Sequence, residues 1–212
     1  MKKNLIFCFV FLGAIALRGQ TDRSQMPEPG PAPEINLQDP QRFELRNGLK
    51  VLVVENHKLP RVTIQLLLDN PPIKEGEKAG GSSLVGSLMG NGSENIPKDE
   101  FNEEVDFLGA TINFGAQSAF AQSLSTYFPR ILELMSEAAL YPDFTEEEFQ
   151  KEKDKLLTSL KAGEKDVGQI AGRVQRALAY GKEHPYGEFT TEETVNNVSL
   201  YDVQEFYRNY FV

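Results

Sequence analysis

The chain has 212 residues, of which 40% are hydrophobic and 25% are charged, and its formal net charge is −9. This length is enough for one domain with a real core, while the acidic excess repels phosphate backbones, so we expect no nucleic acid partner. The single cysteine, Cys8, lies close to the N-terminus. The rest of the chain therefore has no thiol for a disulfide, a nucleophile or a metal site.

The first residues have the pattern of a secretory signal peptide. Lys2 and Lys3 precede an apolar run from Leu5 to Leu17 that contains small residues near its end. We assign residues 1–19 to this signal and expect export to the periplasm or cell envelope. The run is shorter than the roughly 20 apolar residues of a membrane span, so a retained anchor is only an alternative. Cleavage removes three basic residues and no acidic one, which changes the net charge from −9 to −12.

A proline-rich segment follows the predicted signal peptide. Five prolines lie between Met26 and Pro40, with little aliphatic content. This composition predicts an extended linker over residues 20–40. We therefore expect the folded domain to cover residues 41–212.

The first half of this domain contains most of the predicted strands. Alternating runs around Asn47-Gly48 predict a β-hairpin over residues 42–56, and residues 61–69 predict a third strand. Two helices are expected next, from Gly80 to Ser93 and over residues 97–109. Residues 110–116 and 117–128 follow as two more strands.

The second half is mostly helical. The first expected helix runs from Pro129 to Leu140. The second begins at a capping box of Thr145 and Glu148 and carries the apolar residues Phe149, Leu156, Leu157 and Leu160. The third runs from Val167 to Tyr180, and the last begins at Ser199 and Asp202. In the third of these, an apolar face is expected to point inward, made of Val167, Ile170, Val174, Ala177 and Leu178. The order of elements predicts an α+β fold, with an antiparallel or mixed sheet of about five to six strands packed against several helices.

The helix from Gly80 to Ser93 has an unusual composition. Its apolar residues share one side, and the other side has only small ones, namely Ser83, Gly86, Ser87 and Gly90. Glycine within a helix costs roughly 0.5–1 kcal/mol relative to alanine, so the two glycines need a reason. One interpretation is close packing against another element. The other is the loss of functional side chains.

Six short motifs occur in sequence along the predicted domain. They are an N-G-L-K-V hairpin, a G-x-x-x-x-(apolar)-x-x-x-(apolar)-x-x-G-S/T helix, L-G-A-x-(apolar)-N before a strand, F-x-K-E-K on a long helix, H-P-Y-G, and a closing E-F-Y-x-x-Y. Over nearly all of residues 41–211, the chain resembles the N-terminal domain of the pitrilysin/insulinase zinc metallopeptidases. In that family a strand follows the tyrosine-rich helix. This chain ends at Val212 and looks truncated, with that C-terminal strand missing.

The resemblance also implies where the active site of relatives lies. In the family, the first helix carries His-x-x-Glu-His, whose histidines bind zinc and whose glutamate is the base, and a glutamate on the long helix is the third ligand. The aligned zinc-ligand positions here are Ser83, Ser87 and Ser159, and Gly86 stands at the position of the base. The resemblance therefore implies a degenerate member without zinc or another cofactor. The only histidines are His57, expected at the surface, and His184, expected in a structural turn.

We therefore expect a non-catalytic subunit that pairs with a catalytic homologue carrying His-x-x-Glu-His. Its substrate would be a peptide or unfolded protein, bound by β-addition to an edge strand that includes Thr111, Ile112, Asn113 and Phe114. One alternative is an active zinc metalloendopeptidase with atypical ligands. Others are a stand-alone peptide-binding protein and a serine hydrolase, although neither histidine lies in a hydrolase motif.

Overall fold

The structure is a computed structural model that describes residues 26, 30–32 and 39–211. The predicted signal peptide and most of the predicted linker lie outside the described residues. The chain divides into two units between Glu55 and Asn56, a position inside the range 41–212 that was predicted as one domain. Within the described part of the chain, no helix is long and apolar enough to cross a membrane.

The described elements of the first unit form the predicted hairpin. Strand β1 (Gln41–Glu44) pairs antiparallel with β2 (Lys50–Val53). Gly48 adopts a positive φ of 87°, and the Asn47 side chain accepts a hydrogen bond from the Leu49 backbone N–H at 3.2 Å. Both residues thus do what a tight hairpin turn requires, which confirms the prediction from this dipeptide.

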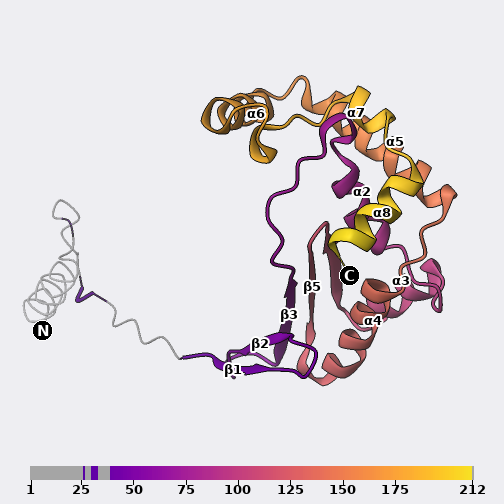
Figure 1. The fold of residues 1–212 in the computed structure, drawn as a ribbon. Coiled ribbons are helices and arrows are strands. Elements are labelled where there is room, and N and C mark those ends of the chain that lie inside the picture. The colour runs from indigo at the N-terminus through magenta and orange to yellow at the C-terminus, as the bar shows by residue number, and fades with distance from the viewer. Residues whose placement is uncertain (1–25, 27–29, 33–38, 212) are drawn as a thin grey trace, which may run out of the picture. The chain divides into compact units, whose positions relative to one another are not determined.

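The second unit contains a three-stranded antiparallel sheet (Figure 1). Its strands are β3 (Arg61–Leu67), β4 (Thr111–Gly115) and β5 (Ser118–Leu124), in the order β3-β5-β4. A two-residue turn, Ala116 and Gln117, joins β4 to β5. The described strands therefore number five, in two antiparallel sheets, which confirms the predicted α+β class.

Helices cover one face of this sheet. Along β5, Ala119 and Ala121 are buried and alternate with less buried residues, as expected for a strand with one covered face. They pack with Phe101 of α3 (Lys98–Phe107) and with Ile131 and Leu134 of α4 (Phe128–Leu140). This cluster fixes the position of β4 and β5 relative to the helices.

A second core cluster joins three helices from distant parts of the sequence. Leu84 and Leu88 of α2 (Gly81–Met89) meet Phe149 of α5 (Glu146–Gly163) and Tyr207 of α8 (Leu200–Tyr210). The buried Tyr207 hydroxyl donates a hydrogen bond of 2.8 Å to the Ala139 carbonyl of α4. Each fully buried leucine contributes about 1.5–3 kcal/mol by leaving water. Helix α2 is thereby held firmly beside α5 and α8.

The helix caps agree with the sequence except at one glutamate. Ser199 and Asp202 form a capping box at the predicted start of α8, and Thr145 caps α5 by accepting from the Glu148 backbone N–H. The Glu148 side chain does not return to the cap. It accepts hydrogen bonds from Lys151 and Lys98 instead, which lower its pKa. The reciprocal half of the predicted capping box is therefore wrong, because two lysines compete for the carboxylate.

Helix α6 (Val167–Tyr180) forms as predicted, but none of its residues is buried. The expected inward residues Val167, Ile170, Val174 and Leu178 are exposed, and Ala177 is half-buried. The predicted inward face is therefore wrong. Figure 1 shows the reason: α6 projects from the helices that cover the sheet, beside the 3-10 turn η4 (Pro185–Gly187). The remaining short elements are η2 (Gly76–Lys78), η3 (Ser125–Tyr127) and α7 (Glu192–Asn196).

Candidate functional site

The two serines at the predicted zinc-ligand positions of α2 lie next to each other at the surface. Ser83 and Ser87 are both exposed, and the Ser87 Oγ donates a hydrogen bond of 3.1 Å to the Ser83 carbonyl. Asn91 donates in turn to the Ser87 carbonyl at 3.2 Å. These residues lie four apart and share one face of the helix. The Ser87 hydroxyl is therefore bonded within its own helix. The two serines offer only hydroxyl groups on this exposed face.

Gly86 does not share that exposed face. It is buried, and a Cβ atom added to it would lie 2.9 Å from both the Gly115 Cα and the Phe114 carbonyl oxygen. Such distances are shorter than real side chains allow, so only glycine fits without a shift of the backbone. The first interpretation, close packing against another element, is confirmed for Gly86. Its predicted place opposite the buried side of α2 is wrong, because β4 covers this flank of the helix.

Strand β4 lies at an edge of the three-stranded sheet, as predicted for Thr111, Ile112, Asn113 and Phe114. Ile112 and Phe114 pack toward the core, while Thr111 and Asn113 are exposed. In a two-residue hairpin, the pair that flanks the turn exchanges both hydrogen bonds, and the pattern then alternates. The backbone groups of Ile112 and Phe114 consequently point away from β5. Because the Phe114 carbonyl faces Gly86, α2 lies against the Phe114 end of this edge.

Ser159 lies on α5, the helix that packs beside α2 in the second core cluster. It is exposed, and it follows by one turn Leu156, whose side chain approaches α2 near Gly80. The structure thus places all three serines at the surface of two neighbouring helices. Their convergence on a single former zinc site stays a prediction.

The residues at these positions do not fit a zinc site of the His-x-x-Glu-His type. Serine hydroxyls are poor zinc ligands, and Gly86 has neither a carboxylate nor space for one. Within the part of the chain that the structure describes, no three His, Cys, Asp or Glu side chains gather as a metal-binding group. His57 is exposed, as expected. His184 caps η4, where its Nδ1 accepts from the Tyr186 backbone N–H at 3.1 Å, which confirms a structural role in this turn.

The loop before α2 is held by carboxylates. Glu75 accepts hydrogen bonds from the backbone N–H groups of Gly80 and Ser82, each at 3.0 Å, and from the Ser82 hydroxyl at 2.5 Å. Glu188 accepts from the backbone of Glu75 and Gly76. Negative charge is favoured at a helix N-terminus, so Glu75 stabilises the start of α2.

A cavity of about 290 Å³ lies beside this loop. It is lined by Glu75 and Ser82, by Ala116 and Gln117 of the β4–β5 turn, and by residues of three further segments, Asn70, Pro72, Ile73, Tyr186 and Phe206. Sequence reasoning missed this group completely. Its members come from five separate segments, and no local pattern in the sequence indicates that they meet.

The sequence profile of the insulinase family (peptidase family M16) matches residues 50–184, more than half of the chain. The chain belongs to the insulinase family. This finding confirms the predicted family, and the fold of the second unit agrees with it.

Among curated proteins, this insulinase-family chain is similar to subunit 1 of the mitochondrial cytochrome b-c1 complex. It is 23% identical to the Bos taurus protein over 92% of the chain and 40% of that protein. The Mus musculus protein is 22% identical, again over 92% of the chain and 40% of the relative. The chain thus spans about two fifths of the length of these relatives.

Two solved structures share the fold. A peptidase M16 inactive domain from Pseudomonas fluorescens superposes with a TM-score of 0.70 at 22% identity, over 80% of this chain and 43% of that one. A protease from Helicobacter pylori superposes with a TM-score of 0.71 at 20% identity, over 82% and 44%. One structure is described as an inactive domain and the other as a protease, so the fold alone does not decide between activity and its absence.

Proposed function

We propose that the chain belongs to an exported, non-catalytic insulinase-family subunit that holds a peptide or unfolded protein and pairs with a catalytic homologue. The main support for the proposal is that two features lie side by side, an α2 helix without catalytic residues and the edge strand β4. The helix that would hold zinc has Ser83, Gly86 and Ser87, and the strand beside it, β4, lies at the edge of the sheet.

The packing of Gly86 supports the loss of catalysis. In an active relative, the residue at this position carries the catalytic base, and its side chain needs space beside the metal. Here the backbone of Phe114 and Gly115 lies too close to Gly86 for even a Cβ atom to fit without a shift. The alternative, an active peptidase with atypical ligands, would need another base and other ligands close together.

The edge of β4 supports peptide binding. Its inward side chains anchor the strand in the core, and Gly86 holds its end against α2. A strand that is fixed in this way can pair with an extended peptide without first becoming ordered, which lowers the entropy cost of binding. Main-chain hydrogen bonds then give affinity for many sequences.

The relatives support a role within an assembly. The curated relatives are subunits of a complex by name, and one structural neighbour is described as an inactive domain. We propose that the partner here is a family member with His-x-x-Glu-His in the same periplasmic or envelope compartment. A stand-alone peptide-binding role is the second candidate, supported by the β4 edge alone.

Reconstitution with such a catalytic relative tests the proposal. We expect the full chain and the relative to elute together from gel filtration at micromolar concentration, and the pair to hydrolyse a fluorogenic peptide faster than the relative alone. Unchanged rates and no complex would contradict the assembly role and leave only stand-alone binding.

Backbone N-methylation of the peptide tests the binding mode. A methyl group on an amide that pairs with β4 blocks a hydrogen bond, whereas one on the next amide points to solvent. We expect methylation at alternate positions to weaken binding and methylation at the intervening positions to leave it unchanged. Equal effects at all positions would exclude β-addition.

A further inference from the structure

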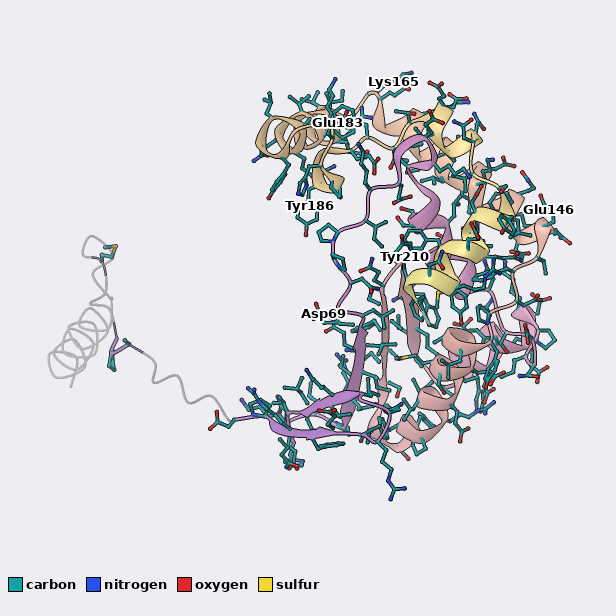
Figure 2. The ribbon with its side chains drawn as sticks, in the orientation of Figure 1. Asp69, Glu146, Lys165, Glu183, Tyr186 and Tyr210 are labelled. Atoms are coloured by element: carbon teal, nitrogen blue, oxygen red, sulfur yellow. The ribbon has the colours of Figure 1, made fainter. Side chains whose placement is uncertain are left out.

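The cavity at the start of α2 combines an acidic wall with aromatic ones. Its lining includes the polar residues Glu75 and Ser82 and the aromatic residues Tyr186 and Phe206. Figure 2 shows Tyr186 extending from η4 toward the segment that follows Asp69. Among the described residues that line the cavity, there is no lysine or arginine to neutralise the carboxylate.

The Glu75 carboxylate keeps capacity for one more donor. An ionised carboxylate offers about four acceptor positions, and three donors reach Glu75: the Gly80 and Ser82 backbone N–H groups and the Ser82 hydroxyl. All three donors are neutral, so none of them cancels the charge. The neighbouring Lys74 pairs instead with Glu183.

Two amide side chains add further acceptors. Asn70 donates its Nδ2 to the Tyr210 carbonyl at 2.6 Å, which leaves its Oδ1 as an acceptor, and Gln117 adds a second carbonyl. Aromatic faces attract cations and also cover the methylene groups of a lysine or arginine side chain. We propose that this cavity binds the cationic group of a peptide, either a guanidinium or an ammonium.

The position of the cavity relates it to β4. Ser82 and Gly86 lie four residues apart on one face of α2. Gly86 packs against Gly115, the last residue of β4. Ser82 lines the cavity together with Ala116 and Gln117, which follow Gly115 in the chain. A peptide that pairs antiparallel with β4 brings its N-terminal part to this end of the strand. The cation therefore lies on the N-terminal side of the paired segment. This position rests on the proposed peptide binding to β4.

Peptide scanning with the full chain tests the inference. The probes are N-acetylated ten-residue peptides of serine, valine and threonine with a C-terminal fluorophore and one arginine at each position in turn. Fluorescence anisotropy is expected to give the highest affinity for arginine near the N-terminus. Citrulline at that position has the same shape without the charge and is expected to bind about tenfold more weakly. Lysine substitution and a free N-terminal amine without arginine distinguish the possible sources of the cation.

Two matched glutamate variants locate the effect on the protein. Glu75→Gln keeps the shape of the side chain and removes its charge, whereas Glu77→Gln removes a charge from an exposed side chain of the same loop. We expect the first variant to lose the preference for arginine over citrulline and the second to keep it. Because Glu75 also caps α2, its substitution can affect folding, so a second variant is needed at an exposed residue. Tyr186 is 52% exposed, and Tyr186→Ala is expected to weaken arginine binding several-fold.

The outcomes separate this inference from the proposed function. Peptide binding that is equal for arginine and citrulline at every position, and that keeps its alternating sensitivity to N-methylation, would overturn the cation site and leave β-addition intact. A preference for arginine that survives Glu75→Gln would also overturn the cavity as its source. Failure of every peptide to bind would overturn both.

Discussion

Replacement of Gly86 by alanine tests how tightly α2 packs on β4. The added Cβ would lie 2.9 Å from the Gly115 Cα, 2.9 Å from the Phe114 carbonyl oxygen and 3.0 Å from the Gly115 carbonyl carbon. All three atoms belong to the backbone, so they cannot move away by rotation of a side chain. Either α2 or the end of β4 must shift, and both are held by buried residues.

The expected free energy follows from two opposing effects. Overpacking of a well-packed core costs about 1–3 kcal/mol, and contact with backbone on a fixed strand places this site at the upper end. Alanine regains about 1 kcal/mol of helix propensity relative to glycine. We therefore expect Gly86→Ala to lower the free energy of unfolding by about 2 kcal/mol, which shifts the urea midpoint down by about 1 M.

Gly90 provides the matched control, one turn further along the helix. A Cβ added there would lie 3.9 Å from the Ser87 carbonyl oxygen and 4.0 Å from the Phe114 ring, and its φ of −80° is accessible to alanine. Gly90→Ala is expected to stabilise by about 0.4–1 kcal/mol, because it restricts the unfolded chain. Urea unfolding followed by circular dichroism measures both variants. A wild-type midpoint for Gly86→Ala, or equal losses at both glycines, would refute the close contact.

Three further results are expected. The Arg130→Met variant removes the hydrogen bonds that lower the pKa of Glu104. The stabilisation from these bonds is present above the ordinary glutamate pKa and is lost as pH falls through the lowered value. The urea midpoints of variant and wild type should therefore differ at neutral pH and converge in acid. The triple variant Ser83→His, Ser87→His, Ser159→Glu should gain zinc, detected by elemental analysis and by a zinc-dependent rise in Tm. No gain would contradict the assignment of these three positions to a former zinc site. The purified wild-type chain should contain no stoichiometric zinc and cleave no peptide, and tight zinc in the same analysis would contradict the non-catalytic proposal.

Local sequence determined most of the secondary structure. Asn47 and Gly48 specify the hairpin turn by a side-chain hydrogen bond and a positive φ, and Ser199 with Asp202 specifies the start of α8. Such signals act over two to four residues, so they need no knowledge of the rest of the chain. The ordered motifs likewise led to the insulinase family, which the match over residues 50–184 confirms.

Tertiary structure decided which element lies against each face. The periodicity of α6 predicts an apolar face, but whether that face is covered depends on other segments, and none of its residues is buried. Gly86 is similar: the helical pattern predicts a place opposite the apolar side of α2, and only packing against Gly115 of β4 buries it. The cavity around Glu75 also joins five segments that no spacing rule connects. Periodicity is encoded within a few neighbouring residues. The contact between two faces depends on the tertiary packing of segments that lie far apart in the sequence.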